Sequence, residues 1–279
     1  MRFAIKTAPQ HTSWSEMLAV WQRADQIDIF ESAWNFDHFY PIFSDSTGPC
    51  LEAWTMLAAM ANATRRIRLG VLVTGNIYRH PAVLAKMAAT VDVISNGRLE
   101  LGIGAGWNQQ ECDAYGITLP PLRERFDMFD EACEVLIKLL SDTTSEFEGR
   151  YYQLNDARCE PKPVQRPHPP ICIGGGGERR TLRAVAKYAQ HWNVPSGDVA
   201  SFQRKRAVLG EHCSAIGRDL STITTSTHLR FDPEGDIKAF VDDVQQWSDG
   251  GLDLGIVYLA PPHRPEVLEP LADALATVE

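Results

Sequence analysis

The sequence lacks the features that mark several classes of protein. Its six cysteines include no C-x-x-C pair, so neither a zinc site nor a disulfide framework is indicated, and reduced thiols are expected. No stretch approaches 18 apolar residues, and the opening MRFAIKTAPQ contains no signal-peptide core. The 27 basic residues are outnumbered by 36 acidic ones, and the net charge of −9 argues against a nucleic-acid partner. We therefore expect a cytoplasmic protein with no metal, membrane or nucleic-acid partner.

Strand-like and helix-like patterns alternate along the whole chain of 279 residues. Several apolar runs, such as LGVLVTG and LGIVYLA, are continuous, as in parallel strands that are buried on both faces. The predicted strands are 2–7, 29–34, 67–74, 98–104, 171–174, 191–194, 222–231 and 254–259. The predicted helices are 14–26, 51–63, 81–95, 123–140, 179–189, 199–216, 236–248 and 264–277. Eight such units in this length favour a single (β/α)8 TIM barrel over residues 1–279.

One segment, 141–170, departs from the alternation of strands and helices. It contains FEGRYYQL, which is strand-like at its ends, and then a proline-rich stretch with few helix-forming residues. We interpret it as an insertion between the fourth and fifth strands, a β-hairpin followed by an extended segment.

Polar and aromatic residues follow the second, third and fourth predicted strands, where a TIM barrel places its ligand site. Asp37 and His38 come after the second strand, and the histidine could exchange a proton near neutral pH. Position alone allows two interpretations, a catalytic histidine or a half-buried structural one. Five aromatic residues suggest a lined substrate pocket, although any of them could instead belong to the core: Trp14, Trp34, Tyr40, Tyr78 and Trp107.

The run GGGG lies between the fifth predicted strand and a helix. Such a turn lets the backbone approach an anion at a helix N-terminus. Arg179 and Arg180 follow the run, and two cations there oppose the helix dipole unless an anion is present. The turn is therefore predicted to bind a phosphate, with a purely structural turn as the alternative.

The segment LGIGAGWN has G-x-G-x-G spacing, so it is not the G-x-G-x-x-G fingerprint of dinucleotide-binding proteins. Gly104 and Gly106 would let a flat ligand lie close to the strand end. The alternative is that these glycines serve barrel packing.

Several segments together resemble the luciferase-like monooxygenase superfamily, and within it the actinobacterial oxidoreductases that use the deazaflavin coenzyme F420. They are FDHF, RIRLGVLVTGNIYRHPAVLAKMAATVDVISNGRLELGIGAGWN, ERFDMFDEACEVL, FEGRYYQL and PKPVQRPHPPICIGGGG. The resemblance is close over residues 1–195 and loose over the last third.

The resemblance implies a barrel that carries the deazaflavin ring over its strand ends. Asp37 and His38 match the pair beside the ring. The segment backing the ring matches Val71, Leu72, Val73 and Thr74, with a non-proline cis peptide expected between the first two. The remaining cofactor contacts match Ala105, Gly106 and Gln110, and the phosphate loop matches Gly175, Gly176, Gly177, Arg179 and Arg180. A homodimer is also implied, paired through the helices at 51–63 and 81–95.

Two positions depart from the family pattern. Trp107 stands where the sugar-phosphate dehydrogenases of the family carry a glutamate, which argues against sugar-phosphate oxidation. His191 stands where a small residue is common.

Three activities are consistent with the sequence. The first is hydride transfer between F420 and a small organic substrate, and the second is oxygenation by reduced FMN. The third is a cofactor-binding barrel without turnover.

Overall fold

A computed structural model describes residues 1–195 and 197–278 of the chain. It contains a parallel sheet in the order β3-β2-β1-β11-β10-β9-β8-β5-β4, and an additional pairing of β3 with β5 closes the sheet into a barrel. The strands are β1 (Arg2–Thr7), β2 (Phe30–Asn35), β3 (Arg68–Val71), β4 (Thr74–Gly75), β5 (Leu99–Gly104), β8 (Ile171–Gly174), β9 (His191–Val194), β10 (Thr224–Phe231) and β11 (Leu254–Leu259). The predicted TIM barrel is thereby confirmed.

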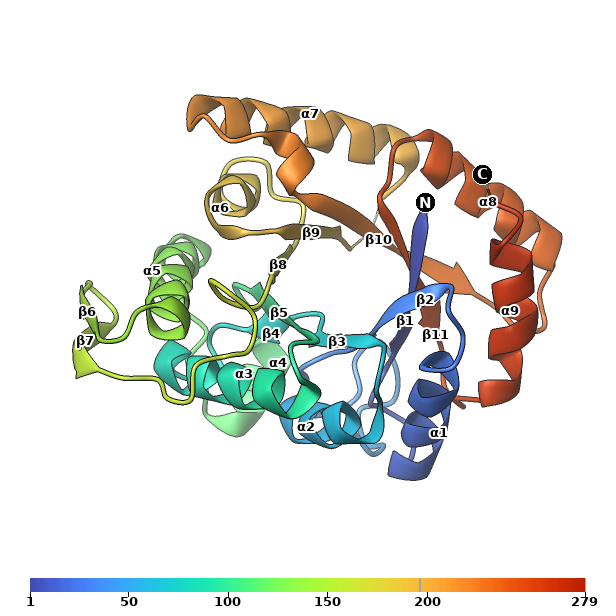
Figure 1. Cartoon of the computed structure of the whole chain (residues 1–279), viewed down its shortest axis with the longest axis horizontal. Helices are drawn as coiled ribbons and strands as arrows, with labels where there is room; N and C mark the ends of the chain where they lie inside the picture. Colours follow the sequence, from blue (N-terminus) through green and yellow to red (C-terminus); the bar gives the residue numbers. More distant parts are fainter. Residues whose placement is uncertain (196, 279) are drawn as a thin grey trace.

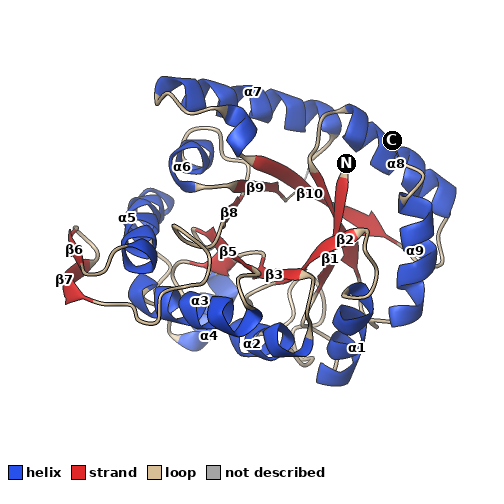
Figure 2. Ribbon diagram, viewed as in Figure 1, coloured by secondary structure: helices blue, strands red, loops and turns tan. Residues whose placement is uncertain are grey.

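Helices surround the barrel on its outside (Figures 1 and 2). They are α1 (Trp14–Ala24), α2 (Ala53–Ala63), α3 (Pro81–Ser95), α4 (Gln109–Tyr115), α5 (Leu122–Ser141), α6 (Thr181–Tyr188), α7 (Val199–Ala215), α8 (Ile237–Asp249) and α9 (Leu268–Leu275). Local chemistry sets their ends. Ser13 and Glu16 form a capping box at the start of α1, and Asn96 ends α3 in the left-handed conformation. No described helix is long and apolar enough to cross a membrane.

The third barrel strand is interrupted, whereas the sequence predicted one continuous strand. The backbone N–H of Leu72 still donates to the Asn35 carbonyl at 2.8 Å, so the ladder with β2 extends one residue past Val71. The cis peptide accordingly joins Leu72 and Val73, and the expected position between Val71 and Leu72 is wrong by one residue.

Glycines on the neighbouring strands make room for this interruption. A Cβ on Gly104 would lie 2.8 Å from the Val73 side chain, and one on Gly174 would lie 3.1 Å from it. A Cβ on Gly102 would overlap the Val71 carbonyl oxygen. For Gly104 the structure therefore supports the packing interpretation, because the space beside it is filled by protein.

The predicted insertion is present as a hairpin and an irregular segment. The strands β6 (Ser145–Glu148) and β7 (Gln153–Ala157) pair antiparallel, and the hairpin lies outside α5 (Figure 1). Glu131 of α5 accepts hydrogen bonds from the backbone N–H groups of Arg150, Tyr151 and Tyr152, which fixes the hairpin to the helix.

The core has two parts. The larger part lies between the sheet and the helices, and the smaller part fills the barrel with Ala4, Trp34, Leu72, Cys172, Leu254 and Ile256. A cluster of polar side chains lies inside the barrel beside this smaller part of the core. The ring of His191 contacts Glu100 at 3.1 Å and Ser226 at 2.6 Å, and the Arg68 guanidinium donates to Glu100 at 2.9 Å.

Candidate functional site at the carboxyl ends of the strands

Asp37 lies two residues after the end of β2, and its side chain is buried. Burial raises the pKa of the Asp37 carboxyl, and the Arg79 guanidinium, which donates to both carboxylate oxygens, opposes that rise. Arg79 also reaches Glu52 at 3.4 Å. The structure therefore places Asp37 in a buried ion pair beside the mouth of the barrel.

His38 is buried next to Asp37, and its Nδ1 lies 2.7 Å from a carboxylate oxygen of Glu111. The same carboxylate accepts from the Tyr78 hydroxyl at 2.9 Å and from the Phe39 backbone N–H. Burial alone would raise the pKa of Glu111, but the hydrogen bonds from His38 and Phe39 outweigh it and the pKa is lowered.

An ionised carboxylate only accepts hydrogen bonds, so the Nδ1 of His38 carries the hydrogen in this pair. The Nε2 of the neutral ring is then an acceptor that can take a proton from a substrate. The arrangement is that of a general base held in one tautomer by a buried carboxylate.

Sequence reasoning did not assign a role to Glu111. The residue lies on α4, a short helix that was not predicted, and it is fully buried. The polar sequence QQECDAY resembles a surface loop, so only its place after the fourth barrel strand indicated proximity to the site.

Aromatic side chains surround His38. The Trp107 indole meets the His38 ring edge-on at 5.5 Å and stacks on Phe43 at 5.6 Å, and Phe36 approaches His38 at 5.2 Å. Trp107 is 53% exposed and Phe43 is 90% exposed, so the pair presents an open apolar face beside the histidine.

The other predicted pocket aromatics lie in different surroundings. Tyr78 is partly buried against Phe39, and Tyr40 lies near Tyr115. Trp34 is fully buried inside the barrel, where its ring meets His191 at 5.6 Å. Trp14 is 38% exposed on the first turn of α1. The site therefore brings Trp107 and Tyr78 next to the His38–Glu111 pair, whereas Trp34 belongs to the barrel core.

The predicted cofactor residues of strand three and those after β5 lie at the carboxyl ends of their strands. Val71, Leu72 and Thr74 are buried, and the Thr74 hydroxyl accepts from the Trp54 indole at 2.7 Å. Ala105 is partly buried and Gln110 is exposed. Gly106 has a φ of 83°, and a Cβ there would lie 2.8 Å from Ile77.

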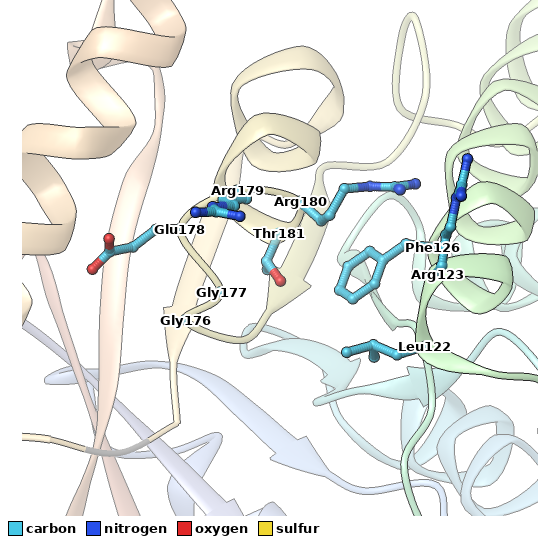
Figure 3. A pocket seen from close by; sticks show the side chains of 9 residues that line it. All are labelled: Leu122, Arg123, Phe126, Gly176, Gly177, Glu178, Arg179, Arg180 and Thr181. Carbon is cyan, nitrogen blue, oxygen red and sulfur yellow. The ribbon is translucent and has the colours of Figure 1, made fainter.

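A second part of the site is a cavity of about 580 Å³ between α5 and the glycine turn before α6 (Figure 3). It is lined by Leu122, Arg123, Phe126, Gly176, Gly177, Glu178, Arg179, Arg180 and Thr181. No side chain caps the N-terminus of α6, and of its first N–H groups that of Leu182 already donates to the Gly177 carbonyl at 3.0 Å.

The two arginines of the turn have different environments. Arg180 pairs with Asp127 at 2.6 Å and with Asp130 at 3.4 Å, and it lies over the Phe126 ring. Arg179 is exposed and has no ion-pair partner among the described residues. Arg179 is therefore the freer of the two to bind an anion.

Lys205 of α7 is a further cation at this turn, and sequence reasoning missed it. A Cβ on Gly176 would lie 2.6 Å from its Nζ, so the amine lies against the glycine backbone. Nothing in the helical stretch FQRKRAVLG distinguishes this lysine from its basic neighbours. Only the packing of α7 beside α6 brings it to the turn.

Comparisons with known proteins agree with the barrel fold. The family model described as "Luciferase-like monooxygenase" matches residues 1–249. An F420-dependent glucose-6-phosphate dehydrogenase of Kineococcus radiotolerans is 31% identical over 253 residues, which are 88% of this chain and 72% of that protein. The pyrimidine monooxygenase RutA of Allorhizobium ampelinum is 33% identical over 149 residues, which are 53% of this chain and 40% of that protein.

A solved structure, that of an F420-dependent secondary alcohol dehydrogenase in complex with an F420-acetone adduct, superposes with a TM-score of 0.88. It is 19% identical and covers 98% of both chains, so it supports the fold alone. Together with the family match over residues 1–249, these observations show that the chain belongs to the luciferase-like monooxygenase family.

Proposed function

We propose that this protein is an F420-dependent oxidoreductase that moves a hydride between the coenzyme and a small organic substrate. The observation that carries the proposal is the buried His38–Glu111 pair at the strand ends, because it can accept the proton released by an alcohol and return it to a carbonyl oxygen as the hydride moves. The name of the Kineococcus radiotolerans relative, which matches most of the chain, supports F420 as the coenzyme.

The residues at the glycine turn fit the phosphate tail of such a coenzyme. Backbone at Gly175, Gly176 and Gly177 would approach the phosphate, with Arg179 and Lys205 providing charge. Arg180 would contribute less than the sequence suggested, because Asp127 and Asp130 already balance it. When bound, the coenzyme supplies a ring carbon that accepts or donates a hydride.

The chain itself supplies proton transfer and shielding from water. In the direction of alcohol oxidation, the Nε2 of His38 takes the hydroxyl proton while Glu111 stabilises the resulting imidazolium through Nδ1. In the opposite direction the imidazolium returns that proton to the carbonyl oxygen. Trp107 and Phe36 pack around the imidazole and limit the access of water to it.

The proposal is tested by titrating the purified protein with F420 and with FMN and following coenzyme fluorescence. We expect F420 to bind more tightly. Lys205→Met should weaken F420 binding about tenfold, the effect of losing one charged hydrogen bond. The matched control is Lys238→Met, which removes a charge from the exposed surface of α8 and should leave binding unchanged.

Tighter binding of FMN would contradict the proposal. It would favour a monooxygenase that uses reduced FMN and oxygen, an activity class that the name of the RutA relative represents. A protein that binds F420 but turns over no alcohol or carbonyl substrate would instead be a cofactor-binding barrel.

A further inference from the structure

Three basic side chains converge inside the mouth of the barrel on strands that the coenzyme contacts do not use. Lys6 of β1 pairs in register with Tyr258 of β11, and Tyr258 pairs with Arg230 of β10. Paired residues on parallel strands point to the same side of a sheet, so Lys6, Tyr258 and Arg230 form one inward-facing row. His228, two residues before Arg230, points inward as well and lies 3.4 Å from the Lys6 amine.

The row lies above the barrel core. Ala4 and Ile256, two residues before Lys6 and Tyr258, belong to the apolar cluster that fills the barrel. Lys6 is buried and donates to the Leu72 carbonyl at 3.1 Å, whereas Arg230 is exposed. The basic group therefore extends from the barrel interior to its opening.

No carboxylate balances these charges within the described ranges 1–195 and 197–278, where neither Lys6 nor Arg230 has an ion-pair partner. Burial lowers the pKa of Lys6 to about 7, a shift that Cys172 partly opposes. Burial, followed by the charges of Lys6 and Arg230, lowers the pKa of His228. Cations held together in the mouth of the barrel favour a bound anion, because the anion replaces the interactions with water that they have lost.

The group is also placed to act together with the acid–base pair. The Phe36 ring lies between the two, with its centroid 5.9 Å from the Lys6 amine and 5.2 Å from the centroid of the His38 ring. A small molecule with its reacting carbon near His38 would reach the basic group across this ring.

We propose that the substrate of the oxidoreductase carries an oxyanion, a carboxylate or a phosphate ester, that binds to Lys6 and Arg230. The reaction assigned to this substrate rests on the proposed function, whereas the anion site itself does not. Neutral His228 accepts from the Lys6 amine at Nε2 and offers its Nδ1–H to the ligand, and the Tyr258 hydroxyl is a further donor in the row.

The experiment is calorimetric titration of the protein, with and without saturating F420, using pyruvate, methyl phosphate and the neutral analogue pyruvamide. We expect saturable binding of at least one of the two anions and none of pyruvamide. Arg230→Gln should weaken anion binding at least about tenfold. Arg158→Gln is the matched control, because it removes an exposed arginine from the insertion and should change nothing.

Lys6→Met provides a second variant, with circular dichroism as the check that it folds, and it should weaken anion binding by a similar factor. Binding of pyruvamide as tight as that of pyruvate, or unchanged binding in Arg230→Gln, would overturn the inference. F420 binding without anion binding would contradict the anion site and leave the proposed function intact. Anion binding that depends on Arg230, without F420 binding, would support the anion site and contradict the proposed function.

Discussion

His38 owes its chemistry to a partner 73 positions away in the chain. In the proposed function the Glu111 carboxylate fixes the hydrogen on Nδ1 and leaves Nε2 to the substrate, while the rings of Phe36 and Trp107 pack against the imidazole. The proposal therefore treats these two residues as one functional unit, which their replacement should show.

His38→Ala should lower turnover by about 10²–10⁴-fold, the usual contribution of general acid–base catalysis. Coenzyme affinity should change little, because the glycine turn provides the anchoring charges. Steady-state kinetics with a separate coenzyme titration checks this, and His168→Ala in the insertion is the matched control. Turnover within about threefold of the wild type would mean that His38 is structural.

Glu111→Gln preserves the shape of the side chain but offers an amide in place of a carboxylate. It should lower kcat by at least about tenfold with little change in KM, because the imidazolium loses its counter-charge. The double variant with His38→Ala should be no slower than His38→Ala alone, since residues that act as a unit have non-additive effects. Additive losses would show that Glu111 acts independently of the histidine.

At the scale of the elements, one buried ion pair joins strands that are not neighbours. Glu100 lies on β5 and His191 on β9, with β8 between them in the sheet. Burial alone would raise the pKa of Glu100, but His191 and then Arg68 lower it to about 2. Burial alone would lower the pKa of His191, but Cys172 and Glu100 raise it to about 10.

These two shifts predict how stability depends on pH. The Glu100 contribution is present above its ordinary value of 4.5 and is lost as the pH falls from there towards 2. The His191 contribution is present below 6.5 and is lost as the pH rises from there towards 10. The free energy of unfolding, measured in urea at a series of pH values, should therefore be highest between these two windows, from pH 4.5 to 6.5. In His191→Gln the alkaline slope should flatten, and an unchanged slope would contradict the assignment.

The glycines around the third strand allow a second test at this scale. Gly102→Ala should destabilise the barrel by about 3 kcal/mol, because its Cβ overlaps the backbone carbonyl of Val71 and neither group can move freely. Gly210→Ala, inside α7 with its nearest neighbour at 3.5 Å, should instead stabilise the protein by about 0.5–1 kcal/mol. Thermal unfolding of both variants separates the two effects, and equal shifts would refute the packing account.

At the scale of the whole molecule, the sequence predicted the barrel well because its strands are continuous apolar runs and its helices carry ordinary caps. The family resemblance implied a cis peptide in the third strand but placed it one residue too early, since no local pattern fixes its position. The sequence also missed α4, a short helix in which four of the seven residues are Gln, Glu or Asp. Contacts at the site were harder to predict. Glu111, Lys205 and Lys6 are charged residues of ordinary appearance, and only tertiary packing determines which of them face the ligand.

We propose that the chain forms a homodimer through α3. The other helix expected at the interface, α2, buries its methionines Met56 and Met60 in the core. Val83, Met87 and Ile94 recur at helical spacing on the outer side of α3, where Val83 and Ile94 are exposed.

Light scattering should give twice the chain mass of 31.1 kDa. The double variant Val83→Arg with Ile94→Arg should give the single mass, because two desolvated cations would face each other across the two-fold axis. Ile216→Arg, at an exposed apolar position after α7, is the control and should remain dimeric. A single mass for the unaltered protein would refute the dimer.

The stacking of Trp107 on Phe43 gives the protein an optical reporter of its own. Of the seven tryptophans, five are buried and only Trp14 and Trp107 are exposed, and Trp107 alone of these two contacts His38. A ligand that covers the mouth of the barrel should shift the tryptophan emission to shorter wavelength and protect it from acrylamide quenching. Trp107→Phe should abolish this change and Trp14→Phe should preserve it, so the occupancy of the site can be followed in the unlabelled protein.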